Sequence, residues 1–410
     1  MRSLKGWLVA CLIFIVSFSF IGCSQEKVQI DPEKQLTEYT KPAVVRVVSY
    51  TSINYQLSAT LSKYLGTKTE QTYYDGGMGS GSVISDNGYI VTNAHVVETA
   101  KLDDKEATKR LDDKFVNDLI DSLQANDQKQ GTNLAPLWKD IVKEHVKLGE
   151  LKRVNKVILP GGDSFIFDVK SFGAPIGEGK DVAVIKIDTN NLPVIQIDQN
   201  DSIQTSDKVV IAGYPGKADL DGLADKDSAL VSTYTNGAIA AKKSTEKGPL
   251  LQLDANVNPG NSGGPVLSKE GKIIGIATAT SKDGIGWAVP SSTILEYARQ
   301  AGAVINQPGV VTQKWQEGLT LYWGNYYQKA MPKFEEVQRL YGKHYGVAEY
   351  ISKSQKAIAD GKDRKDWNDY LIWIIAGAAV LLLVILVLVF FLLRSRKKRA
   401  AENSNLPNNP

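Results

Sequence analysis

A serine in a glycine-rich turn is the first residue whose surroundings could support chemistry. Ser262 lies in the stretch Asn258-Pro259-Gly260-Asn261-Ser262-Gly263-Gly264-Pro265. A serine hydroxyl attacks a carbonyl carbon efficiently only when nearby N–H groups hold the oxyanion that forms. Glycines allow a tight turn with positive φ, and the N–H groups of Gly260 and Ser262 are the expected oxyanion hole. Asn-Pro-Gly-Asn is also ordinary β-turn sequence, so this motif alone leaves a purely structural turn open.

A histidine and an aspartate supply the two other groups that serine acyl transfer requires. Of the three histidines in the chain, His95 follows a short apolar run and small residues, whereas His145 and His344 lie in helical stretches. Asp181 begins the apolar run that ends at Ile187. We predict that Asp181 orients the imidazole of His95, which is the base for Ser262. The alternatives are a structural histidine and a solvated strand end.

Short apolar runs separated by turn residues must position these groups. Such runs recur from Ala43 to about Thr293, and Asp86-Asn87-Gly88 joins two of them as a hairpin. Many short strands with glycine-rich turns favour a mainly β fold, either a sandwich or closed barrels.

Two regions have a helical period instead. Between about 98 and 153, Leu111, Phe115, Leu119 and Leu123 recur at every fourth position and form one apolar stripe. Residues 310–362 are predicted to form a small helical unit. In that unit we expect the aromatic residues of 322–327 to pack in a helix core, and Pro332 to start a second helix.

Together, these motifs resemble the HtrA (Deg) family of bacterial trypsin-fold serine proteases. The resemblance covers residues 40–300 with interruptions, and it implies two six-stranded β-barrels with the active site in the cleft between them. It also implies cleavage of peptide bonds without a cofactor or metal. The strings that carry it, besides those around His95, Asp181 and Ser262, are Gly79-Ser80-Gly81-Ser82, residues 209–216, residues 235–239 and residues 284–290.

The chain departs from the family pattern in three places. PDZ domains commonly follow the protease in this family, and here the helical unit at 310–362 stands in that place. The region 98–153 is an insertion that could be a lid or docking surface near the cleft, or a solvated excursion on the outer face. A milder expansion covers 51–77. The resemblance implies that residues 274–278 and 284–288 flank the primary specificity pocket. No acidic residue lies in 284–288, although Asp283 precedes it, so we expect an apolar residue before the scissile bond.

Both ends of the chain carry membrane signals. Residues 1–22 have the layout of a signal peptide, and Cys23 lies in a lipoprotein-like box, although ordinary cleavage or an uncleaved anchor are alternatives. Residues 371–393 contain no charge and are long enough to span a bilayer. The basic tail at 394–410 is expected to be cytoplasmic and the protease extracytoplasmic. The only cysteines are Cys11 and Cys23, so no disulfide is expected in the mature ectodomain.

The predicted function is that of a membrane-anchored serine endopeptidase acting on exported or misfolded proteins. The alternative is a catalytically silent, chaperone-like protein that binds peptides in the same cleft; a membrane sensor is supported only by the short basic tail. The expected partners are protein or peptide substrates, the membrane, and a second copy or an adaptor at the helical unit. The net charge of +3 argues neither for nor against nucleic acid, and no nucleic-acid partner is expected.

Overall fold

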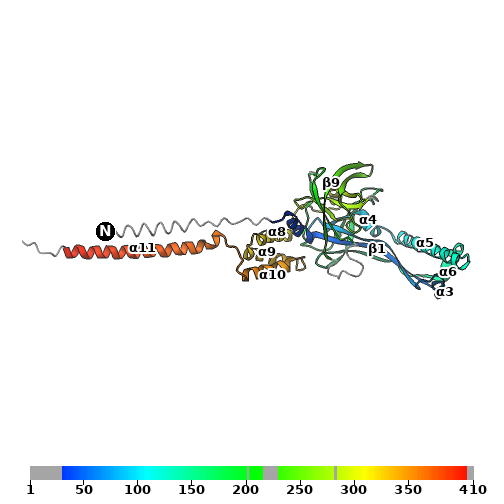
Figure 1. Ribbon diagram of the computed structural model, residues 1–410, viewed down its shortest axis with the longest axis horizontal. Helices are drawn as coiled ribbons and strands as arrows, with labels where there is room; N and C mark the ends of the chain where they lie inside the picture. Colours follow the sequence, from blue (N-terminus) through cyan, green and yellow to red (C-terminus); the bar gives the residue numbers. More distant parts are fainter. Residues whose placement is uncertain (1–29, 201–202, 216–229, 281–283, 404–410) are drawn as a thin grey trace, which may run out of the picture.

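The computed structural model describes residues 30–200, 203–215, 230–280 and 284–403. The molecule is elongated, and a long helix, a small helical unit, a β-rich body and a projecting arm follow one another along its length (Figure 1). The predicted signal peptide at 1–22, Cys23, Asp283 and residues 404–410 lie outside the described residues.

The first half of the β-rich body is a barrel of six strands. They follow one another in the order β2-β3-β7-β6-β5-β1, and antiparallel pairing of β1 with β2 closes the circle. A short seventh strand, β4, pairs with the far end of β1. The strands are β1 (Val44–Leu57), β2 (Glu70–Val83), β3 (Tyr89–Thr92), β4 (Val146–Leu148), β5 (Lys152–Ile158), β6 (Ser164–Phe172) and β7 (Ala183–Ile187).

The second half is a closed barrel with the strand order β10-β13-β12-β11-β8-β9. These strands are β8 (Lys208–Gly213), β9 (Thr233–Thr245), β10 (Gly248–Asp254), β11 (Pro265–Leu267), β12 (Ile273–Thr280) and β13 (Gly286–Pro290). The prediction of a mainly β fold with two six-stranded, trypsin-like barrels is therefore confirmed.

The hairpin expected at Asp86-Asn87-Gly88 joins β2 to β3. Gly88 has a φ of 97° and donates its N–H to Ser85 O at 3.1 Å. A Cβ at this position would collide with the carbonyl oxygen of Ile187. Only glycine satisfies both the positive φ and the close approach, which explains why the turn ends on this residue.

One hydrophobic cluster spans the two barrels, and the second barrel has a further cluster of its own. Val44 and Val47 of β1 belong to the same buried cluster as Leu267 and Ile276 of the second barrel. The helix α7 (Ser291–Gln300), which follows the last strand, adds Ile294 to this cluster. The barrels are thus held against each other by apolar packing along their interface.

The two expanded regions of the sequence, 51–77 and 98–153, form one body, which we call the arm. The outer halves of β1 and β2 extend beyond the barrel as a hairpin whose ends are joined by α3 (Ala59–Leu65). The long helix α5 (Asp104–Gln130) and the short α6 (Trp138–His145) pack beside it (Figure 1). The arm has its own core, in which the α5 stripe meets the apolar face of the hairpin: Leu111, Phe115, Leu119 and Leu123 from α5 with Ile53, Tyr55, Leu57 and Leu61.

A helical unit lies between the barrels and the long apolar helix at the end of the described chain. Its helices are α8 (Val310–Trp323), α9 (Tyr327–Leu340) and α10 (Val347–Ala359), which pack around Trp315, Phe334 and Tyr350. The expectation for Pro332 was wrong, because α9 begins five residues earlier, at Tyr327, and contains the proline. A proline in the second turn of a helix forfeits only one backbone hydrogen bond, and the burial of Phe334 and Val337 compensates for it.

The first described helix, α2 (Pro32–Thr40), is bound to this unit by contacts with α8, which we call the clasp. The indole N–H of Trp315 donates to Glu38 O at 2.8 Å, and the hydroxyls of Tyr39 and Thr320 lie 2.9 Å apart. Tyr39 also packs against Trp323, with the ring centroids 5.6 Å apart. The beginning and the end of the folded body therefore meet.

The last helix, α11 (Trp367–Asn403), leaves from the helical unit. The segment before it is held against α9 and the preceding turn: Gln328 N–H donates to Asp363 at 2.9 Å, and Arg364 N–H donates to Asn325 O at 2.9 Å. Within the described residues, α11 contains the one helix segment, Tyr370–Lys398, that is long and apolar enough to cross a membrane.

His344 is a buried titratable residue in the core of the helical unit. Its exposed fraction is 4%, and its ring lies 4.5 Å from that of Trp315. Burial lowers the pKa of His344 to about 3, because the charged form loses its hydration.

We expect the helical unit to lose stability in mild acid. In the unfolded chain a histidine has a pKa of about 6.5, so unfolding takes up a proton as the pH falls below that value. The stabilisation is complete above about pH 6.5, and the free energy of unfolding should fall by about 1.4 kcal/mol per pH unit between pH 6 and 4. Urea unfolding followed by tryptophan fluorescence measures this slope. His344→Leu should reduce the slope by the part that corresponds to the uptake of one proton. An unchanged slope in His344→Leu would contradict the assignment.

Candidate active site

His95 lies at the start of a short helix that follows directly on strand β3. The helix α4 spans Ala94–Val97, and its N-cap residue, Asn93, donates its side-chain N–H to the backbone oxygen of Asp181 at 2.7 Å. This contact fixes the end of β3 against the start of β7. The His95 side chain is one-third exposed, so one side of the imidazole faces protein and the other remains accessible.

Asp181 is buried, with an exposed fraction of 2%, and its carboxylate accepts three hydrogen bonds. One oxygen accepts the backbone N–H of His95 at 3.0 Å, and the other lies 2.7 Å from His95 Nδ1. The hydroxyl of Thr278 in β12 donates to that second oxygen. A carboxylate acceptor at Nδ1 places the proton of the neutral imidazole on Nδ1, which leaves Nε2 as the basic nitrogen.

Ser262 lies in the loop between β10 and β11. The chain turns at residues 258–261, where Asn261 N–H donates to Asn258 O at 2.9 Å and Gly260 has a φ of 99°. Gly263, with a φ of 83°, donates its N–H to Ala277 O at 2.8 Å. The glycine-rich loop is therefore fastened to β12 directly behind Ser262.

The hydroxyl of Ser262 donates to Thr278 O at 3.0 Å. Within the described part of the chain, it makes no hydrogen bond to His95. Thr278 thus touches both Ser262 and Asp181, and it joins the three predicted site residues into one cluster. A rotation of the Ser262 side chain would be needed before the imidazole could take its proton.

The backbone N–H groups of Gly260 and Ser262 donate no hydrogen bond to any described residue, so both are available to an oxyanion. The adjoining peptide is fixed from both sides, because Gly260 O accepts the hydroxyl of Ser80 at 2.7 Å while Asn261 N–H is bound within the turn. This arrangement is preorganised to hold negative charge.

Sequence reasoning missed the roles of Ser80 and Thr278. Ser80 is fully buried; its N–H donates to Ser262 O at 2.8 Å, and its hydroxyl accepts from Tyr214 N–H at 2.8 Å. It therefore ties the Ser262 loop to the first barrel. For each residue, the only available signal was a hydroxyl in an otherwise small or apolar strand, because the partners come from segments distant in the sequence.

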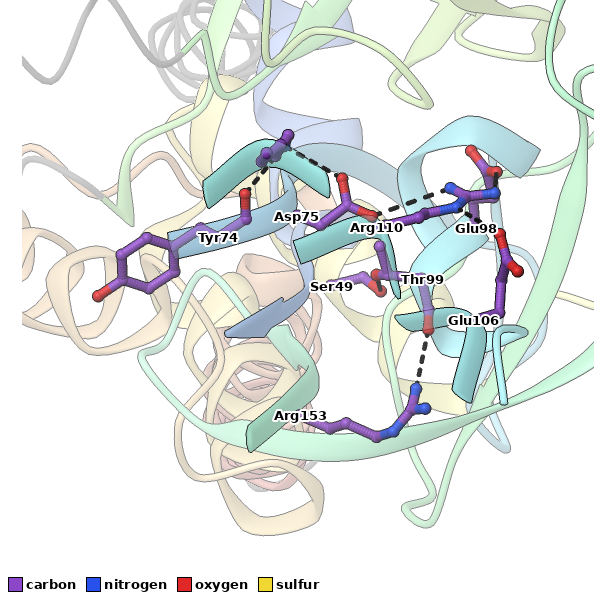
Figure 2. Close-up of polar contacts among 9 residues, drawn as sticks. Ser49, Tyr74, Asp75, Glu98, Thr99, Glu106, Arg110 and Arg153 are labelled. Atoms are coloured by element: carbon purple, nitrogen blue, oxygen red, sulfur yellow. Dashed lines mark hydrogen bonds and ion pairs between the residues drawn. The ribbon is translucent and has the colours of Figure 1, made fainter. Parts of the chain in front are cut away.

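The arm joins the site at the residues that follow the His95 helix (Figure 2). Arg110 of α5 forms an ion pair of 2.9 Å with Glu98, the C-cap residue of α4. Thr99 shares a hydrogen bond of 2.8 Å with Ser49 of β1, and its carbonyl accepts from Arg153 of β5 at 3.1 Å. The segment after the histidine is consequently held from the barrel and from the arm.

The cluster contains no metal-type arrangement. Across residues 30–403, as far as they are described, no group of three or more His, Cys, Asp or Glu side chains could hold a metal ion.

Comparison with known proteins finds similarity to a family and to several curated relatives. The family described as trypsin-like peptidase domain matches residues 79–276. The serine protease HhoB of Synechocystis sp. is 30% identical over 227 residues, which cover 53% of this chain and 38% of HhoB. A DegP-like periplasmic serine endoprotease of Chlamydia muridarum is 29% identical over 223 residues, covering 52% of this chain and 31% of the relative. The chain spans well under two-thirds of the length of these curated relatives.

A solved structure of an HtrA-type protease, an AlgW variant with a tripeptide, has 22% sequence identity and a TM-score of 0.38, and the match covers 66% of this chain and 63% of that one. The paired barrels, the family match and the curated relatives show that the chain has the trypsin fold and is similar to HtrA-like proteases.

Proposed function

We propose that this protein is a membrane-anchored, extracytoplasmic serine endopeptidase that cleaves exported or misfolded proteins. The observation that carries the proposal is the buried carboxylate of Asp181, which holds both the backbone and the ring of His95 beside the Ser262 loop. Residues 40–300 are the proposed protease domain. The relatives named as serine proteases support the same activity.

In the proposed mechanism, the Ser262 hydroxyl leaves Thr278 O and turns to Nε2 of His95. As Oγ attacks the peptide carbonyl carbon, the imidazole takes the proton and Asp181 stabilises the imidazolium. The carbonyl oxygen becomes an oxyanion that accepts hydrogen bonds from the N–H groups of Gly260 and Ser262. The C–N bond then breaks, and His95 returns the proton to the leaving amine. Water hydrolyses the acyl-enzyme by the same steps in reverse.

A second candidate is a catalytically silent protein that binds unfolded peptides in the same cleft. The hydrogen bond of Ser262 to Thr278 O favours it, because a hydroxyl held there is not activated. This bond must be broken only once per catalytic cycle, at a cost comparable to that of one hydrogen bond, about 1 kcal/mol. The endopeptidase is therefore the stronger candidate.

The remaining assignments complete the proposal. The uncharged segment at 371–393 supports a membrane span, and the cations that follow it at once support a cytoplasmic basic tail at 394–410. Lipid attachment at Cys23 would add a second anchor. The helical unit at 310–362 is the proposed binding place for an adaptor or a second copy, and an apolar residue is proposed before the scissile bond.

A fluorophosphonate probe should label the detergent-solubilised full chain at Ser262. The probe reacts only with a serine that a base has activated, so Ser262→Ala should lose all labelling. Labelling is read by mass spectrometry and gel fluorescence. Ser268→Ala, a change just after β11 and outside the candidate site, is the matched control and should label at the normal rate. A folded wild-type protein that resists the probe would favour the silent binding protein instead.

A further inference from the structure

The arm, which projects from the β-rich body (Figure 1), carries a groove of its own. It has a volume of about 310 Å³ and lies between the outer end of the β1–β2 hairpin, α3 and α5. Apolar side chains, among them Leu65, Tyr73 and Leu119, line one part of it. Two exposed carboxylates, Asp118 and Asp121, line another.

The charge of the groove has one sign. No lysine or arginine is among the described residues that line it. Asp118 and Asp121 are three positions apart on α5 and therefore share one face of the helix, where like charges repel. Burial and a hydrogen bond to Asp118 raise the pKa of Tyr73 to about 12, so the tyrosine stays neutral and helps to hold that carboxylate in place. A cationic group bound in the groove would relieve the repulsion between the two carboxylates. Apolar groups next to that cation would cover the apolar side chains that line the groove.

One strand connects this groove to the candidate active site. Gln71 and Tyr73 of β2 line the groove, and further along the same strand the N–H of Ser80 donates to Ser262 O at 2.8 Å. The nine residue-to-residue steps from Gln71 to Ser80 span about 30 Å in extended conformation.

Most of the outer edge of this strand is not paired with another described strand, although Lys114 of α5 donates to Tyr74 O at 3.0 Å. β2 pairs with β1 from Glu70 to Ser82, whereas β3, its other described neighbour, pairs with it only at Ser82 and Val83. Between the groove and Ser80, Tyr74 is 55% exposed and Met78 is 53% exposed. An extended polypeptide could follow this edge from the groove to Ser262 without displacing any other described strand, once the Lys114 side chain has left Tyr74 O.

We propose that the groove is a docking site for polypeptide substrates, and that it binds a lysine or arginine flanked by apolar residues about nine extended residues from the scissile bond. The inference rests on the proposed endopeptidase function and extends it to substrate choice. Unfolded chains long enough to reach both sites are favoured, whereas short peptides reach only the cleft. Two contacts on one chain raise its effective concentration at the second site.

The test compares a long and a short substrate in the detergent-solubilised full chain. The long substrate is β-casein, and the short one is a peptide of about ten residues around a casein cleavage site, too short to reach the groove. Asp118→Asn combined with Asp121→Asn should raise KM for casein about 5- to 10-fold, as expected for losing two partly screened charge contacts. The values of kcat for both substrates, and KM for the short peptide, should stay unchanged.

Salt provides a second readout. Raising the ionic strength from about 0.05 to 0.5 M should raise KM for casein in the wild type and have little effect in the double variant, because salt screens exposed charges. Joining Lys-Leu-Lys to the short peptide through a glycine–serine linker should lower its KM when the linker has about nine residues or more, and not when it has about three.

The matched control is Asp113→Asn combined with Asp140→Asn, which removes two exposed aspartates from α5 and α6 outside the groove. Equal KM values for casein in the two double variants would overturn the proposal. So would a change of oligomeric state in the groove variant by sedimentation, since it would indicate a second copy as the occupant. If the wild type cleaves neither substrate and resists the fluorophosphonate, the endopeptidase function fails; cleavage with an unchanged KM overturns the docking site alone.

Discussion

Replacing Asp181 with asparagine should lower kcat/KM for a peptide substrate by about 10⁴-fold at neutral pH. The carboxylate accepts a hydrogen bond of 2.7 Å from Nδ1 of His95 and another of 3.0 Å from the backbone N–H of the same residue. An asparagine can keep the backbone contact, but its amide N–H then faces Nδ1 and favours the tautomer with the proton on Nε2. That tautomer cannot accept the serine proton. The loss corresponds to about 5.4 kcal/mol of transition-state stabilisation.

The measurement is steady-state cleavage of a fluorogenic peptide, together with the rate of fluorophosphonate labelling. Asp188→Asn, an exposed aspartate one residue beyond β7, is the matched control and should leave both rates unchanged. If Asp181→Asn stays within about tenfold of the wild type, Asp181 does not orient the base.

Replacing Gly263 with alanine should remove at least 99% of the activity and destabilise the protein by about 2 kcal/mol or more. Gly263 has a φ of 83°, and a Cβ there would collide with the backbone oxygen of Ser80 and the hydroxyl of Thr92. Neither obstacle can move easily, because Ser80 is buried in β2 and the Thr92 hydroxyl donates to Ser80 O. The strain must then shift the loop that carries Ser262, and a shift of about 1 Å costs about 100-fold in rate.

Gly302→Ala separates backbone strain from collision. Gly302 has a similar φ of 74°, but no atom lies within 4 Å of the position that its Cβ would take. This control should cost some thermal stability and leave peptide cleavage unchanged. Comparable activity in Gly263→Ala and Gly302→Ala would contradict the claim that the contact with Ser80 positions the Ser262 loop.

The sequence was most informative where the structure is local. The β-branched runs and the Asp86–Gly88 turn predicted strands and a hairpin, and two closed barrels were expected from the family resemblance. Ser262, His95 and Asp181 could be singled out because each lies in a short motif whose residue types suit one chemical task. The structure places these three residues around Thr278, although their catalytic roles remain proposals.

The arm shows where local patterns stop being informative. The stripe Leu111, Phe115, Leu119 and Leu123 predicted a helix with one buried side, but it could not reveal what covers that side. The cover comes from the outer halves of β1 and β2, which lie well before α5 in the chain. Apolar faces pack together because packing removes them from water, whatever their distance in the sequence. The expansions at 51–77 and 98–153, which are separate in the sequence, therefore form one body.

For the same reason, the contacts of Thr278 could not be predicted from the sequence. Its hydroxyl has no unusual neighbour along β12, and its partners, Asp181 and Ser262, arrive from two other segments. The resting position of the Ser262 side chain likewise depends on a backbone oxygen 16 residues away. Contacts of this kind are set by the register of the barrels, which no local pattern encodes.

The clasp between α2 and α8 has a mechanical consequence. Glu38 and Tyr39 near the start of the folded body bind Trp315 and Thr320 near its end. A force applied between α2 and α11 is therefore expected to pass through the contact of α2 with α8. The barrels, which lie between these two helices in the sequence, would then not be stretched. While these contacts hold, we expect a pull on α11 to leave the spacing of Asp181, His95 and Ser262 unchanged.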